Sequence, residues 1–113
     1  MIEAICRIPV TLKTMDSSVS ELVRNSGYLE SRGALTSEAL VPYLREHPEL
    51  IDAWLGYSSD KRTSSGWYMK RSRQHVFEVG FFPHGESQSY TDAARACADF
   101  IAHELREVGG HAG

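Results

Sequence analysis

Apolar and polar residues alternate near the start of the chain. The even-numbered positions from Ile2 to Leu12 are apolar, and most of the odd-numbered positions between them are polar. A period of two is typical of a β-strand with one buried face. Pro9 cannot donate a backbone hydrogen bond, which favours the edge of a sheet. The pattern therefore predicts an amino-terminal edge strand over residues 2–12.

Residues 18–60 change to the spacing of three and four residues that is typical of amphipathic helices. Ser18 and Glu21 have the spacing of a capping box, and Gly27 can supply the left-handed residue that ends a first helix. Pro48 fits the first turn of a later helix, where its missing amide hydrogen is not needed. The segment predicts three helices, over residues 18–26, 37–46 and 48–60.

Beyond residue 66 the period of two returns and predicts a β-hairpin over residues 66–82, which turns at residues 72–74. A polar loop is expected at residues 85–89, and Thr91 can cap a last helix. The apolar positions that would share the buried face of the hairpin are Trp67, Met69, Phe77, Val79 and Phe81.

Together these elements predict an α+β fold in a single domain, residues 1–113. A small antiparallel sheet, made of the amino-terminal strand and hairpin 66–82, would pack with the carboxy-terminal helix and a helical segment over residues 18–60. A chain of 113 residues can bury one modest core. Its apolar runs are too short to cross a bilayer, and Glu3 and Arg7 interrupt a possible secretion signal, so we expect a cytoplasmic protein.

Charge is distributed unevenly along the chain. Residues 61–75 contain five basic residues and no acidic one, whereas residues 1–60 and residues 76–113 each carry a net charge of −4. A basic hairpin on an acidic body can steer an anionic partner or a nucleic acid to one face. Basic side chains on a hairpin also discourage sheets from pairing edge to edge, which requires no partner. Both interpretations stay open.

Aromatic residues lie between these basic residues, an arrangement that exposed binding surfaces use. Trp54 and Trp67 are expected in the core because they fall in phase with apolar neighbours. Tyr68 would share its strand face with Lys70 and is the better candidate for an exposed contact. The residues that we expect to form a partner-binding surface are Tyr57, Asp60, Lys61, Arg62, Tyr68, Lys70 and Arg71.

Catalytic and metal-binding motifs are scarce. His103 and Glu104 begin the string HELRE, but Glu107 stands where the HExxH zinc motif requires its second histidine. We interpret this string as a solvated helix face. Cys6 and Cys97 have no metal-ligand spacing and are expected to be buried free thiols. The sequence therefore predicts no catalytic residue, metal site or cofactor.

The segment W-x-x-YS-x-DKR-x-SSGWY, from Trp54 to Tyr68, resembles one in small bacterial proteins of uncharacterised function. The later string YTDAARACADFI is similar to the helix that closes those proteins, and the resemblance extends over residues 19–108. It implies no catalytic residue. Some acidic bacterial proteins of this size are immunity proteins, which block a cognate toxin. By that analogy the chain would bind a protein partner such as a toxin.

Two functions follow as hypotheses. The first is a non-catalytic protein-binding module, an immunity-type inhibitor being one example. The second is a winged helix-turn-helix protein that binds nucleic acid, with helix 48–60 in the major groove and basic hairpin 66–82 as the wing. Glu49 and Asp52 would repel phosphate at the amino end of that helix, and the whole chain carries a net charge of −3. We therefore favour the first.

Overall fold

In a computed structural model the chain forms an antiparallel sheet and a set of helices around one hydrophobic core. The structure describes residues 2–14, 18–31, 36–61, 66–73, 75–82, 85 and 87–111. The elements are α1 (Ile2–Cys6), α2 (Ile8–Thr14), α3 (Val19–Asn25), α4 (Tyr28–Ser31), α5 (Ser37–Glu46), α6 (Pro48–Lys61), β1 (Gly66–Arg73), β2 (Val76–Phe82), β3 (Ser87–Tyr90) and α7 (Ala93–His111).

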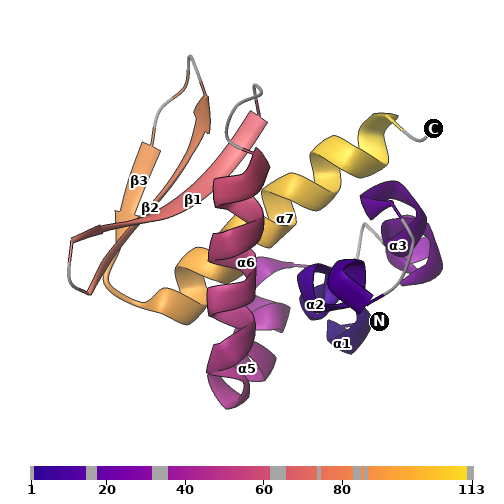
Figure 1. Ribbon diagram of the computed structural model, residues 1–113, viewed down its shortest axis with the longest axis horizontal. Coiled ribbons are helices and arrows are strands. Elements are labelled where there is room, and N and C mark those ends of the chain that lie inside the picture. Colours follow the sequence, from indigo (N-terminus) through magenta and orange to yellow (C-terminus); the bar gives the residue numbers. More distant parts are fainter. Residues whose placement is uncertain are drawn as a thin grey trace.

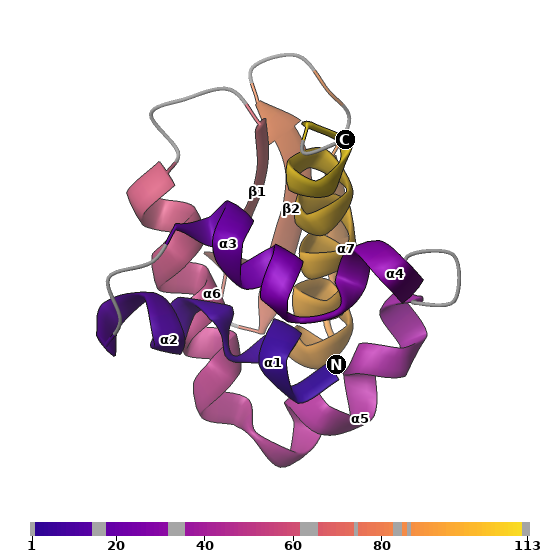
Figure 2. The ribbon, with the colours of Figure 1, turned by 90° about the vertical axis from the view of Figure 1, so that its right-hand side faces the viewer.

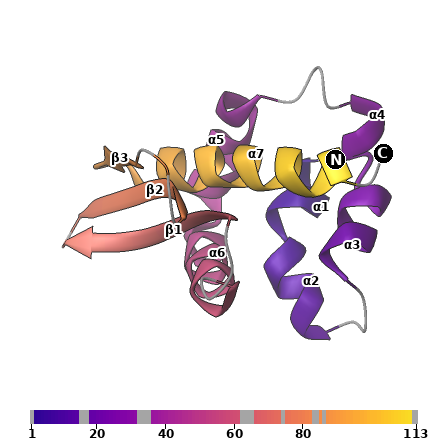
Figure 3. The same cartoon turned by 90° about the horizontal axis from the view of Figure 1, so that it is seen from above.

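The arrangement confirms the predicted α+β fold, with a small antiparallel sheet packed against the carboxy-terminal helix. The sheet lies at one side of the molecule and α1 to α3 at the other, with α6 between them (Figure 1). Seen from above, α7 runs from the sheet towards the amino-terminal helices (Figure 3). Its far end contacts α3, which crosses it in Figure 2. Helix α7 therefore connects the two sides of the molecule.

The predicted amino-terminal strand is wrong, because residues 2–14 form helices α1 and α2. Ile5, Ile8 and Pro9 are buried and Leu12 is half-buried, at the spacing of three and four residues that one helix face requires. The alternating pattern had counted Ile5 and Pro9 as solvent-facing positions. Pro9 lies in the first turn of α2, where the lack of an amide hydrogen is tolerated.

Short side-chain caps begin α3 and α5. The hydroxyl of Ser18 accepts a hydrogen bond from the amide of Glu21 at 3.2 Å, and the hydroxyl of Thr36 accepts one from the amide of Ala39 at 3.3 Å. Gly27 follows α3 with a φ of 88°, which confirms the expected glycine at the end of this helix. These local signals explain why the boundaries of α3 and α5 could be predicted.

Helix α7 is capped by Asp92 rather than by Thr91. One carboxylate oxygen of Asp92 accepts a hydrogen bond from the amide of Ala94 at 3.1 Å. The other accepts a hydrogen bond from the guanidinium of Arg45, which lies on α5. This hydrogen bond to Arg45 is the main reason why the pKa of Asp92 lies below its usual value. The start of α7 is thereby attached to α5.

The described strands pair antiparallel in the order β1-β2-β3. Trp67 lies opposite Phe81 and Met69 opposite Val79, so the apolar face of the hairpin is the one that α7 covers. Hairpin 66–82 is confirmed, although β1 extends to Arg73, beyond the start of the expected turn. Strand β3 replaces most of the polar loop expected at residues 85–89; its sequence, SQSY, has no apolar alternation that would reveal it.

Trp54 lies at the centre of the core. Its side chain is 1% exposed, and its ring meets the edges of Tyr57 and Phe100 at centroid distances of 5.2 and 5.9 Å. The indole nitrogen donates a hydrogen bond to the backbone carbonyl of Cys6 at 2.9 Å. Trp54 of α6 therefore contacts α7 on one side and α1 on another, and its burial was predicted correctly.

Tyrosine hydroxyls donate to carboxylates across several contacts between elements. The pairs within the described residues are Tyr57 of α6 with Glu104 of α7, Tyr68 of β1 with Glu78 of β2, and Tyr90 of β3 with Asp99 of α7. The last is 2.6 Å long. Burial, together with the neighbouring carboxylate, raises the pKa of each phenol, and that of Tyr90 reaches about 12. These phenols are therefore neutral donors at physiological pH.

Candidate functional site

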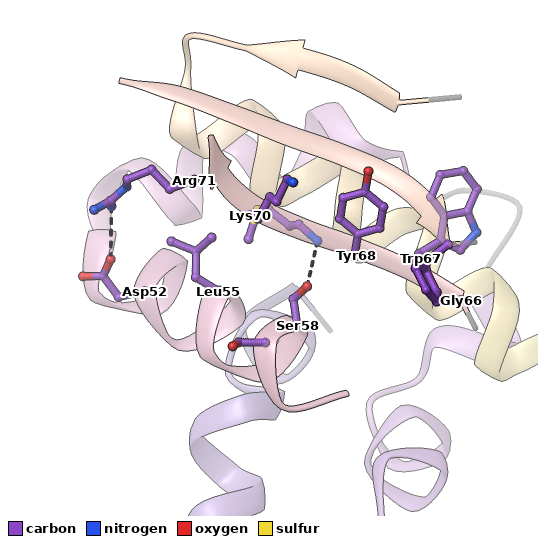
Figure 4. A pocket seen from close by; sticks show the side chains of 11 residues that line it. Asp52, Leu55, Ser58, Gly66, Trp67, Tyr68, Lys70 and Arg71 are labelled. Atoms are coloured by element: carbon purple, nitrogen blue, oxygen red, sulfur yellow. Dashed lines mark hydrogen bonds and ion pairs between the residues drawn. The ribbon is translucent and has the colours of Figure 1, made fainter. Parts of the chain in front are cut away.

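A groove of about 670 Å³ lies between α6 and β1. Helix α6 supplies one wall through Asp52, Leu55, Ser58 and Ser59, which recur on one helix face. Strand β1 supplies the other wall through consecutive residues 66–71, and Figure 4 shows how the labelled residues of the two elements lie. The volume lies in the range that binds a small ligand or part of a peptide.

Helix α6 closes part of the free edge of β1. Ser58 is 2% exposed, and its hydroxyl accepts a hydrogen bond from the amide of Met69 at 2.7 Å. Amides two residues apart in a strand point in the same direction, so those of Trp67 and Arg71 also point away from β2. Because Ser58 occupies the middle of this edge, another strand cannot pair along its whole length.

Two basic side chains flank one end of the groove. The ammonium of Lys70 lies 4.0 Å from the carboxylate of Glu78, and the guanidinium of Arg71 lies 3.8 Å from that of Asp52. Both basic side chains are 57% exposed, and such long, solvated ion pairs contribute less than about 1 kcal/mol each. Either basic group can therefore turn to an incoming anion at small cost.

The phenol of Tyr68 lies over Gly80 on the opposite strand. A Cβ at position 80 would come within 2.7 Å of the Tyr68 hydroxyl and within 2.9 Å of the Cβ of Ser87. The absence of a side chain at Gly80 makes room for the phenol, whose hydroxyl donates to Glu78. Tyr68 is thus held along the face of the sheet that α7 does not cover.

The other end of the groove is apolar. Phe82, which pairs with Gly66, is 49% exposed at this end, whereas half-buried Leu55 of α6 lies nearer Asp52 and Lys70 (Figure 4). Trp67 packs edge-on against Phe81, with ring centroids 5.5 Å apart, and stacks in parallel on His103, with ring centroids 3.8 Å apart. Burial lowers the pKa of His103, which keeps the imidazole neutral against the indole. The groove therefore joins an aromatic end to a basic end.

The structure brings together only some of the residues expected from the sequence. Tyr68, Lys70 and Arg71 line the groove. Tyr57 does not, because its half-buried ring packs against Trp54 and its hydroxyl donates to Glu104. Asp60 and Lys61 end α6, where only the backbone is described, and Arg62 lies outside the described residues.

Sequence reasoning missed Ser58, Leu55 and Phe82. A serine near the end of a helix carries no signal for its hydrogen bond to a distant strand. Phe82 did carry a signal: it alternates in phase with Glu78 and Gly80, so an aromatic side chain falls on the solvent-facing side of the hairpin. A single exposed apolar residue is common on protein surfaces, so this signal marks a contact surface only together with the groove beside it.

No catalytic arrangement is found among the described side chains that the sequence had drawn attention to. The expectation of a solvated face at HELRE is wrong for Glu104, which is 3% exposed. Burial raises the pKa of both thiols, that of Cys6 to about 12, so neither is a ready nucleophile. No group of three or more His, Cys, Asp and Glu in the described ranges is placed to hold a metal ion.

None of the described helices has the length and apolar character needed to cross a membrane. The expected burial of Cys6 and Cys97 is confirmed. Comparison of the chain with protein-family models, with curated proteins and with solved structures finds no match.

Proposed function

We propose that this protein is a non-catalytic, cytoplasmic module that binds another protein through the groove between α6 and β1. Phe82 carries the proposal, because this large aromatic side chain is 49% exposed in a groove whose opposite end is formed by Lys70 and Arg71. Aromatic and arginine side chains are the commonest anchors of protein interfaces. An immunity-type inhibitor of a toxin is one such module, since it needs a binding surface and no active site of its own.

A winged nucleic-acid-binding protein is the second candidate. The order of α3, α5 and α6 before the hairpin favours it. However, Asp52 of the supposed reading helix pairs with Arg71 of the supposed wing, and Glu49 is exposed in the first turn of that helix. Carboxylates at these positions would repel phosphate. These contacts support the protein-binding hypothesis over this alternative.

Affinity capture from a lysate of the source cell, with and without nuclease, tests the proposal. We expect one protein to be retained in stoichiometric amount after nuclease treatment. The double variant Lys70→Glu and Arg71→Glu should weaken that retention. The matched control is Lys13→Glu with Arg24→Glu, which makes the same charge change at exposed sites on α2 and α3, far from the sheet (Figure 3).

The outcomes separate the candidates. Loss of all captured material after nuclease treatment would favour the winged nucleic-acid binder. Capture of nothing under either condition would contradict the protein-binding proposal. Equal loss of binding in the groove variant and in the control variant would show that only overall charge matters, and would contradict the placement of the site.

A further inference from the structure

We infer that the groove between α6 and β1 accepts an extended, acidic segment of the partner protein, with a carboxylate and a large apolar side chain four residues apart. The inference rests on the proposed function and specifies the chemistry that the groove selects. Three features carry it: the contrast between the two ends of the groove, the distance between them, and the difference in net charge between the segment that contains the groove and the rest of the chain.

The two ends of the groove favour different side chains. At one end, Phe82 is 49% exposed, so it can bury apolar area when a partner binds. Covering an aromatic side chain of this kind is favourable in proportion to the area removed from water. At the other end, Lys70 and Arg71 are both 57% exposed and can bind a carboxylate. The occupant therefore needs an apolar group and an anionic group.

The distance between the ends indicates an extended segment. Phe82 pairs with Gly66, and Lys70 lies four residues further along β1. At about 3.3 Å per residue, four residues of strand span roughly 13 Å. An extended segment that lies along β1 presents side chains four residues apart on one side at the same separation. A helix, which rises about 1.5 Å per residue, would need eight or nine residues to span it.

Charge indicates an acidic occupant. By sequence, residues 48–82 carry five basic residues against four acidic ones, whereas the rest of the chain carries a net charge of −4. The remainder of the chain is acidic, so an acidic segment is attracted to this surface and repelled elsewhere. Asp52 competes with such a segment, because it already pairs with Arg71 across the groove at 3.8 Å.

Because α6 closes part of the edge of β1, side-chain contacts rather than backbone hydrogen bonds decide which segments the groove binds. Ser58 holds the amide of Met69, so an incoming segment cannot form a continuous ladder of backbone hydrogen bonds with β1. Affinity must then come from the two ends of the groove. The spacing of the partner's side chains, rather than its strand-forming tendency, decides which segments bind.

Selection of a library of random linear peptides on the folded protein tests the inference. We expect enriched peptides to carry Asp or Glu four residues from a large apolar residue. Peptide binding, measured by fluorescence anisotropy, should fall at least about tenfold in Phe82→Ser and several-fold in Lys70→Gln. Val10→Ser is the matched control, since Val10 on α2 is the other exposed large apolar side chain among the described residues, at 38%.

A gain of binding provides a second readout that loss of folding cannot imitate. Asp52→Asn should tighten binding of an enriched peptide by about twofold to fivefold, because it removes the competing carboxylate. Glu49→Gln, the same change on the exposed first turn of α6, should leave binding unchanged. Peptides that lack the acid or the spacing, or that bind Phe82→Ser as well as the original protein, would overturn the inference, as would a library that yields no enrichment.

Failure of the inference can be told from failure of the proposed function. If a captured protein partner binds Phe82→Ser and Lys70→Gln as well as it binds the original chain, the protein has a partner but the groove does not hold it. If capture retains no protein at all, the proposed function itself fails. A DNA duplex that displaces an enriched peptide from the groove would also overturn the inference.

Discussion

The substitution Trp54→Phe tests whether the amino-terminal helices pack on α6 as described. The indole is 1% exposed, and its nitrogen donates to the carbonyl of Cys6 at 2.9 Å, which joins α6 to α1. Phenylalanine keeps an aromatic ring at the site but cannot make this hydrogen bond. If residues 2–14 formed a strand beside the hairpin instead, Trp54 would not have this partner, and the substitution would remove apolar contacts alone.

The expected cost has two parts. The smaller ring leaves a void of roughly 40 Å³, which at about 24 cal/mol per Å³ costs about 1 kcal/mol. The carbonyl of Cys6 loses its bond to the indole in a buried setting, which costs about 1–3 kcal/mol. The free energy of unfolding should therefore fall by about 2–4 kcal/mol. For a protein of this size that corresponds to a decrease in Tm of roughly 4 °C per kcal/mol.

Urea unfolding followed by far-ultraviolet circular dichroism measures this change without relying on tryptophan emission. Trp67→Phe is the matched control, because Trp67 is half-buried at the groove and its ring contacts with Phe81 and His103 can be kept by phenylalanine. We expect this control to cost less than about 1 kcal/mol. Equal costs for the two substitutions would refute the described packing of α1 on α6.

Three further predictions concern the hairpin and its contacts. Ser58→Ala should destabilise the protein by about 1–3 kcal/mol, because the buried amide of Met69 loses its acceptor. The control Ser59→Ala, at an exposed neighbouring position, should change stability by less than about 0.5 kcal/mol. Similar values for the two variants in urea unfolding would contradict the bond between Ser58 and β1. Gly80→Ala should lower the free energy of unfolding by about 1–3 kcal/mol, and by less in a Tyr68→Ala background, where the phenol no longer obstructs the added methyl group. A penalty of the same size in both backgrounds, measured by thermal unfolding, would contradict the close contact between Tyr68 and Gly80. Burial lowers the pKa of His103 in the folded protein, so its neutral form contributes fully to the free energy of unfolding above the ordinary histidine pKa of about 6.5. This contribution should decrease as the pH falls towards the lowered pKa, and His103→Gln should remove that decrease. Identical pH profiles of unfolding for the two proteins would contradict this prediction.

Most of the fold could be predicted where local signals and tertiary packing agree. The hairpin shows a clear period of two, and α3 and α5 begin at side chains that cap their own backbones. The prediction of a strand over residues 2–12 failed because their apolar positions fit both the period of a strand and that of a helix, and only packing on α6 selects the helix. Strand β3 failed for a different reason: its short polar sequence is a strand because β2 offers it an edge.

The candidate site was predictable only on one side. Tyr68, Lys70 and Arg71 follow from the alternation of β1, which places basic and aromatic side chains near one another. The opposite wall depends on how α6 lies against β1. No local pattern encodes that placement, since it follows from the burial of Trp54 and from the bond between Ser58 and the strand.

Each tyrosine–carboxylate pair described above places a chromophore at a different contact: α6 with α7, β1 with β2, and β3 with α7. An ionised phenol absorbs ultraviolet light at a longer wavelength than a neutral one, and it can ionise readily only once its contact with the carboxylate opens. An alkaline titration, assigned with tyrosine-to-phenylalanine variants, would therefore record when each contact separates. Loosening of the hairpin could then be timed against loosening of the helices without any attached label.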